Sequence, residues 1–276
     1  MNRIGFMQGR LSPLVGGSIQ AFPWTHWRDE YLLASQYGLQ LMEWTLDQKQ
    51  LHDNPLLTSS GREEIRVLRS RYGLSIPSLT GDCFQQAPFW KANGAERERL
   101  ELDFLAVTRA CSDLGIRCVV VPLVDHGALE TREQEEIFLG FISAHAETFR
   151  KGHLSVAIES DFGPAELQHF ISRLPSDLVG INYDIGNSAA LGYPFHQEIS
   201  AYGDRILNVH VKDRILRGTT VPLGTGNARL PETIAALERK GYRGNYILQT
   251  ARAVDDDHGG VLCRYRDMLK RWMKQV

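Results

Sequence analysis

The chain has 276 residues, a formal net charge of −2, and 43% hydrophobic and 23% charged residues. That balance excludes a nucleic-acid-binding surface built on a basic excess. No apolar run approaches the ~20 residues that span a bilayer, and the N-terminus lacks the apolar core of a signal peptide. The four cysteines form no CxxC pair and have no metal-finger spacing. We therefore expect a cytoplasmic protein with reduced thiols and no membrane partner.

One sequence pattern recurs along the chain: an amphipathic stretch, a glycine, and then a short apolar run. A glycine just past a helix can adopt the left-handed conformation that ends it. An apolar run too short for a helix is typical of a buried parallel strand. The pattern occurs around Gly38, Gly73, Gly115, Gly152 and Gly241. Eight strands are predicted, centred on Ile4–Phe6, Leu39–Met42, Ser75–Leu79, Cys118–Val121, Ser155–Ile158, Gly180–Tyr183, Ile206–Val209 and Tyr246–Leu248.

The segments between these runs have helical periodicity. Apolar residues from Leu100 to Leu114 step by three and four, which makes one helical face. Eight strands alternating with helices, without a linker, predict one (β/α)₈ TIM barrel domain over residues 1–276. The alternative is a doubly wound sheet. Such a sheet usually carries GxGxxG after its first strand, and "IGFMQGRLSP" does not supply it.

Polar residues close most of the predicted strands. Active sites of such barrels lie at these strand ends. Glu159, Asp184 and His210 each follow an apolar run on three consecutive strands, and neighbouring strands lie about 4.8 Å apart. Buried carboxylates repel each other unless a cation lies between them, and this donor set suits Mn²⁺, Co²⁺, Zn²⁺ or Mg²⁺. The alternative is a buried ion-pair cluster, with His210 on Asp184 and Lys212 on Glu159 or Asp213.

Several motifs resemble one family. "AIES", "NYDIGN", "NVHVKD" and "PLGTGNARLPETIAALERKGYRGNYILQ" are similar to xylose isomerase-like TIM barrels of the sugar phosphate isomerase/epimerase type. These include L-ribulose/L-xylulose 5-phosphate 3-epimerases and ketose 3-epimerases. The resemblance covers most of the chain from "LQLMEWTLD" onward. It implies one divalent metal ion, with Mn²⁺ favoured, held by Glu159, Asp184, His210 and a fourth residue, here Gln249 instead of glutamate.

The resemblance also implies an activity. A divalent-metal-dependent isomerase or epimerase would act on a sugar or sugar phosphate, with Glu159 removing a proton next to a metal-bound carbonyl. The family's fourth ligand, a glutamate, is the second acid/base, and Gln249 brings neither charge nor a titrating proton. Asp82, Asp125 or Glu43 could supply that group. The alternatives are a metal-dependent dehydratase, which is a lyase with one base, and a catalytically silent sugar-binding barrel.

A fourth alternative, an endonuclease IV-like enzyme, needs several strand-end histidines and a basic face, and it is disfavoured. Substrate contacts are expected from Glu43, Asn187, Lys212 and Arg252, with a small-molecule carbohydrate as the partner. An ion pair is the alternative role for Glu43, a solvated surface position for Arg252, and a structural role for Lys212. The resemblance allows a homo-oligomer. The aromatic stretches "IQAFPWTHW" and "APFW" are expected in mouth loops, as a lid and pocket wall or as a dimer contact.

Overall fold

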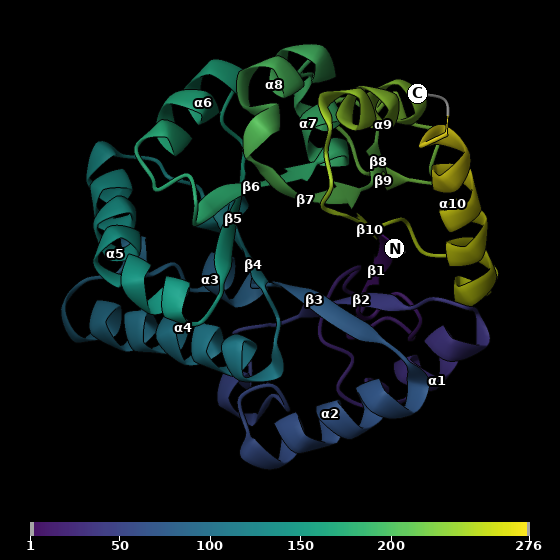
Figure 1. Ribbon diagram of the computed structural model, residues 1–276, viewed down its shortest axis with the longest axis horizontal. Coiled ribbons are helices and arrows are strands. Elements are labelled where there is room, and N and C mark those ends of the chain that lie inside the picture. The colour runs from purple at the N-terminus through teal and green to yellow at the C-terminus, as the bar shows by residue number, and fades with distance from the viewer. Residues whose placement is uncertain (1–2, 275–276) are drawn as a thin grey trace.

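Eight parallel strands close into a barrel in the computed structural model, which describes residues 3–274 (Figure 1). Each strand pairs with its chain neighbours, and the last barrel strand pairs with the first. The strands are β1 (Ile4–Met7), β2 (Leu41–Thr45), β3 (Ser75–Thr80), β4 (Cys118–Leu123), β5 (Ser155–Ser160), β6 (Val179–Asp184), β7 (Ile206–Val211) and β10 (Asn245–Leu248). A small antiparallel pair, β8 (Asp213–Arg214) and β9 (Thr220–Val221), follows β7.

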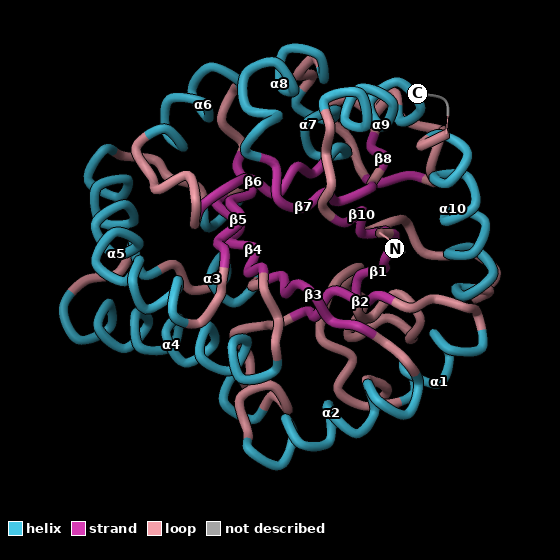
Figure 2. Tube along the Cα trace, viewed as in Figure 1, coloured by secondary structure: helices cyan, strands magenta, loops and turns pink. Residues whose placement is uncertain are grey.

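Helices form an outer ring around the strands (Figure 2). They are α1 (Asp29–Gln36), α2 (Ser59–Tyr72), α3 (Asp82–Gln86), α4 (Gly94–Leu114), α5 (Arg132–Lys151), α6 (Pro164–Ser172), α7 (Ile185–Leu191), α8 (Phe195–Tyr202), α9 (Leu230–Lys240) and α10 (His258–Trp272). Short 3₁₀ turns lie at Leu51–Asp53, Phe89–Lys91, Asp125–Gly127 and Gly203–Arg205. Within residues 3–274, no helix combines the length and apolar character needed to cross a membrane.

The predicted strands and barrel are confirmed. Each of the eight apolar runs overlaps a barrel strand, and the closed order excludes the doubly wound sheet. Gly73, Gly115 and Gly241 end their helices with φ of 64°, 72° and 89°, as the recurring sequence pattern predicted. Gly152 differs, because its φ is −75° and His153 takes the left-handed conformation with φ 52°. The four cysteines are free thiols.

The aromatic stretches of the mouth loops turn inward. Phe22 and Trp27 pack against Trp44 of β2, with ring centroids 5.4 Å and 6.0 Å apart. Phe89 and Trp90 pack on the aromatic rings of α4 and α5, and all four loop rings are buried. These rings therefore anchor the loops to the layer between strands and helices. None of these four rings lines the barrel mouth cavity, so they do not form the expected lid, whereas Ile19 and Gln20 of the first stretch do form part of the cavity wall.

Candidate functional site

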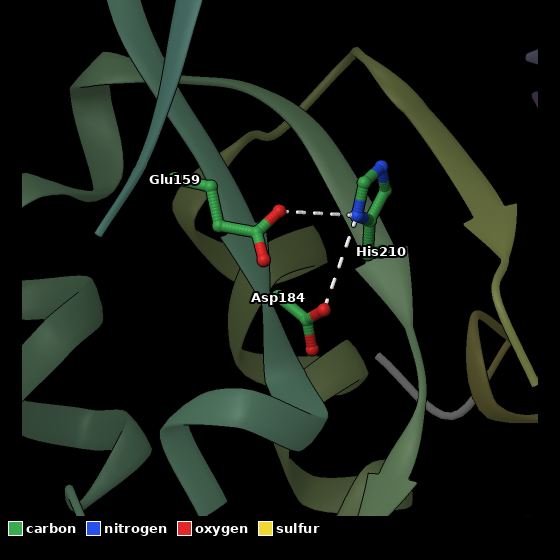
Figure 3. A group of neighbouring side chains, drawn as sticks. All are labelled: Glu159, Asp184 and His210. Atoms are coloured by element: carbon green, nitrogen blue, oxygen red, sulfur yellow. Dashed lines mark ion pairs between the residues drawn. The ribbon is translucent and has the colours of Figure 1, made fainter. Parts of the chain in front are cut away.

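Three strand-end side chains meet at the carboxyl end of the barrel (Figure 3). Glu159 comes from β5, Asp184 from β6 and His210 from β7, and one ligand atom of each lies within 4.8 Å of the others. His210 Nδ1 is 3.3 Å from Glu159 Oε2 and 3.9 Å from Asp184 Oδ2. All three side chains are buried. The structure thus brings together the three residues that the strand ends singled out.

Strand register explains this convergence. Asp184 of β6 lies opposite His210 of β7, and Asn182 lies opposite Asn208 two positions earlier. Side chains two apart on a strand point to the same face. The two asparagines therefore form an amide layer directly beneath the acid and histidine.

The amide layer connects the site across the barrel. Asn182 Nδ2 donates to Glu159 Oε2 at 2.7 Å and lies 3.0 Å from His210 Nδ1. Asn208 Nδ2 donates to Asn182 Oδ1 at 2.9 Å and to Glu43 Oε2 at 2.8 Å. Sequence reasoning missed both asparagines. The available signal was their spacing, two residues before a predicted ligand on each strand.

Glu43 is sealed beneath the site. Its carboxylate accepts hydrogen bonds from Ser78 and Thr80 at 2.5 Å each, and from Asn208. Its Oε1 also lies 2.6 Å from His210 Nε2. Both oxygens are thus occupied, and the side chain is fully buried. This corrects the expected substrate contact: Glu43 orients the imidazole and does not reach the cavity in which a substrate would lie.

The ionisable groups of the cluster stay charged although they are buried. Burial lowers the pKa of His210, but the charge of Glu43 and the hydrogen bond with Glu159 outweigh it and raise the pKa to about 10. Burial raises the pKa of Glu43, yet the charge of His210 and the surrounding hydrogen bonds outweigh it and leave it lowered. The pKa of Glu159 is lowered in the same way, by His210, Lys212 and Asn182 against burial. Two ionised carboxylates therefore flank the imidazole.

A cavity of about 360 Å³ opens above the cluster at the barrel mouth. That volume suits a small polar ligand such as a sugar. Its polar lining includes Arg10, Gln20, Asp82, Asp125, His126, Glu159, Asn187, Lys212, Arg214 and Gln249. Of the residues expected to contact substrate, Asn187 and Lys212 line the cavity. Arg252 does not, because its guanidinium donates to the backbone oxygen of Ser12 in the β1 loop.

Asn187 and Lys212 are tied to the acids. Asn187 Nδ2 donates to Glu159 Oε1 at 2.8 Å, and its Oδ1 accepts from Arg214 at 2.8 Å. Lys212 Nζ lies 2.7 Å from Asp184 Oδ2, so the lysine pairs with Asp184, not with Glu159 or Asp213. Asp184 Oδ2 is thus ion-paired with the lysine, while Asp184 Oδ1 accepts from the backbone N–H of Asn187 at 2.9 Å.

The orientation of Gln249 follows from a chain of amides. Asp82 Oδ2 accepts from Gln20 Nε2 at 2.7 Å, so Gln20 turns its oxygen toward Gln249 and accepts from its Nε2 at 2.7 Å. Gln249 Oε1 therefore points away from Gln20. This oxygen is buried and has no hydrogen-bond partner.

These residues fit a divalent cation. The buried Oε1 of Gln249 has no hydrogen-bond partner, and buried polar atoms are normally satisfied. Carboxylate, amide and imidazole donors suit Mn²⁺ and related ions. A bound cation would also neutralise the negative charge of the cluster, which raises the pKa of His210.

The fold and site define a class: a (β/α)₈ barrel with a buried acid–acid–histidine cluster at the carboxyl ends of its strands. Residues 32–274 match the model of the xylose isomerase-like TIM barrel family, and the chain belongs to it.

Individual relatives are distant. The chain is 24% identical over 266 residues to L-ribulose-5-phosphate 3-epimerase UlaE of Escherichia coli (strain SMS-3-5 / SECEC), covering 91% of each. A solved L-ribulose 3-epimerase has a TM-score of 0.72 at 17% identity, over 100% of this chain and 95% of that one. A xylose isomerase-like TIM barrel protein from Mycobacterium smegmatis in complex with magnesium has a TM-score of 0.70 at 16% identity, over 98% and 96%. At these identities the structural likeness establishes the fold.

Proposed function

We propose that this protein is a divalent-cation-dependent isomerase or epimerase of a sugar or sugar phosphate. The observation that carries the proposal is the buried Glu159–Asp184–His210 cluster beneath a sugar-sized cavity. The epimerases among its relatives support the same substrate class.

The cation would be held by Glu159, Asp184, His210 and Gln249, with Mn²⁺ favoured by the donor set and Co²⁺, Zn²⁺ or Mg²⁺ as alternatives. When bound, it would polarise a substrate carbonyl and stabilise the negative charge that develops on its oxygen. The convergence of Glu159, Asp184 and His210, and the buried Gln249 oxygen that has no hydrogen-bond partner, support this ligand set.

Glu159 is the proposed base. Asn182 and Asn187 each donate to one of its oxygens, at 2.7 Å and 2.8 Å, which fixes the carboxylate at the cavity wall. Its lowered pKa keeps it ionised near neutral pH. It would take the proton from the carbon next to the substrate carbonyl. Asn187 and Lys212, which also line the cavity, are the proposed contacts for substrate hydroxyls.

A lyase is the second candidate. Gln249 has no titrating proton, so a reaction that needs one base, such as dehydration, is compatible with the site. Loss of water changes the product's mass and its carbonyl absorbance, and therefore separates the two candidates directly.

The test begins with metal content. Elemental analysis after reconstitution with Mn²⁺ should give one ion per chain, lost in Asp184→Asn and His210→Asn. His169→Asn, an exposed histidine on α6, is the matched control and should keep the ion. Loaded protein is then incubated in D₂O with ketopentoses, ketohexoses and their phosphates. Deuterium at the carbon next to the carbonyl supports the proposal. A protein that binds no metal, or exchanges no proton in any substrate, overturns it.

A further inference from the structure

Gln249 leaves the proposed reaction without a second proton-transferring group, and three other strand-end acids are candidates. Glu43 is sealed below the cluster with both oxygens occupied. Asp125 lies on an exposed turn at the rim, where it accepts from Gln85 at 3.0 Å. Asp82 remains, half-buried with an edge open to the cavity that Glu159 lines.

Asp82 is held at the wall that Gln249 also forms. It follows β3 and begins α3, and Gln20 from the β1 loop bridges it to Gln249 through one amide. Glu159 ends β5, on the far side of β4 from β3. The two carboxylates therefore enter the cavity from different strands, with Asp82 linked to the position where the family resemblance places its second glutamate.

We propose that Asp82 is the second acid/base of this site and replaces the carboxylate missing at position 249. The inference rests on the proposed function. Gln20 is the positioning residue: it accepts from Gln249 and donates to one Asp82 oxygen, which leaves the other oxygen for substrate.

The charge environment supports the assignment. Burial, together with the charges of Asp47 and Glu159, raises the pKa of Asp82 to about 7, against the opposite effects of the Gln20 hydrogen bond and of His210. Arg10, the nearby cation on the cavity wall, is itself buried with its pKa lowered to about 9. A carboxyl group with a pKa near the working pH can both give and take a proton.

The proton balance is as follows. Glu159 takes the proton from the substrate carbon, the C–H bond breaks, and its electron pair forms the enediolate while negative charge moves to the carbonyl oxygen. Asp82, as the neutral acid, gives its proton to the same carbon from the other face. A new C–H bond forms and the carbonyl is restored. Glu159 ends protonated and Asp82 ionised, and exchange with solvent resets both.

The test separates proton removal from inversion. Mn²⁺-loaded protein is incubated in D₂O with the ketose and ketose phosphate panel. Wild type should form epimer carrying deuterium. Asp82→Asn should still exchange the substrate proton with retention, because Glu159 removes and returns it on one face, while epimer formation falls about 10²–10⁴-fold. Glu159→Gln should lose both. Gln20→Ala should lower epimer formation and shift the alkaline limb of its pH profile, because Asp82 has to be protonated to act as the acid and Gln20 lowers its pKa.

Asp177→Asn, the same change on an exposed aspartate, is the matched control and should behave as wild type. An Asp82→Asn protein that epimerises at the wild-type rate overturns the inference and leaves the proposed function intact. So does one that is folded and metal-loaded but loses exchange as well as inversion, or a wild type that isomerises without inverting. A wild type with no exchange removes the proposed function, and the inference with it.

Discussion

Glu43 Oε1 and His210 Nε2 lie 2.6 Å apart in the centre of the barrel, both fully buried. An ionised carboxylate can only accept a hydrogen bond, so Nε2 carries the proton and Nδ1 is the nitrogen turned toward Glu159 and Asp184. Carboxylate–histidine pairs of this kind fix the ring of metal-binding histidines. Glu43 therefore decides which nitrogen the site offers.

Glu43→Gln tests that role. The amide keeps the shape but weakens the hold on His210, so Mn²⁺ affinity should fall about 10–100-fold. Isothermal titration calorimetry of metal-free protein measures it. Glu198→Gln is the control, because Glu198 is equally buried but accepts from Tyr183 and Tyr202, and its affinity should match wild type. Unchanged affinity in Glu43→Gln would show that the carboxylate does not orient the imidazole.

The stability of metal-free protein should fall at alkaline pH. The pKa of His210 is raised from 6.5 to about 10 by Glu43 and Glu159 against burial. A raised pKa gives stability that is complete below about pH 6.5 and is lost as pH rises toward 10. Urea unfolding between pH 7 and 10 should show a loss on the order of a few kcal/mol, absent from His210→Asn. A flat profile in wild type would contradict the paired imidazolium.

The barrel was predictable because its signals are local. Each strand is an apolar run bounded by a helix-ending glycine or a polar residue, and the run at Ser155–Ile158 matches β5 without its neighbours being known. Glu159, Asp184 and His210 were predictable for the same reason, since each directly closes a run. Position along the strand is enough to bring such side chains to one end of a barrel.

Contacts across the barrel could not be predicted this way. Glu43 and Asn208 are 165 residues apart, and the strand pattern alone does not say which acid points below the site and which into it. Gln20 lies in a long loop without periodicity, so nothing local indicated that it bridges Asp82 and Gln249. The mouth-loop aromatics misled for a related reason: composition marks a loop as aromatic but not which way its rings turn.

Asp82→Asn should stabilise the protein above neutral pH. Burial raises the pKa of Asp82 from 3.8 to about 7. Stability is therefore lost as pH rises from about 4 through 7, and the ionised group is unfavourable above that. Asparagine removes this unfavourable ionisation. It should raise the free energy of unfolding by about 1–2 kcal/mol at pH 8, after allowance for the half-exposed side chain. Urea unfolding at pH 8 measures it, and a destabilised variant would show that Asp82 is not strained by its surroundings.

Lys212→Met should destabilise the metal-free protein more than the metal-loaded protein. Lys212 Nζ is the cation 2.7 Å from the buried Asp184, and removal of one partner of a buried pair costs about 3–5 kcal/mol. In metal-loaded protein a bound cation neutralises Asp184, so the loss should be smaller. Thermal unfolding with and without Mn²⁺ compares the two. Lys151→Met, from an exposed pair with Glu147, should change neither. Equal losses in both states would place the cation away from Asp184.

Gln249→Glu restores the missing carboxylate and should tighten Mn²⁺ binding at least about tenfold, because a charged oxygen replaces an amide oxygen that has no hydrogen bond. The matched variant Gln249→Met removes the oxygen and should weaken binding. Both affinities come from calorimetric titration. Identical affinities in the two variants would show that Oε1 of Gln249 does not face the ion.

The same substitution should disturb Asp82. Gln20 now turns its oxygen to position 249 and its amino group to Asp82. A carboxylate at position 249 would require the opposite orientation, and Asp82 would then face the Gln20 oxygen and have to carry a proton. The pKa of Asp82 should therefore rise above about 7, and metal-free Gln249→Glu should be less stable than wild type at pH 8. Adding Asp82→Asn should recover that loss, because the asparagine amide can donate to the reoriented Gln20 oxygen without having to take up a proton first.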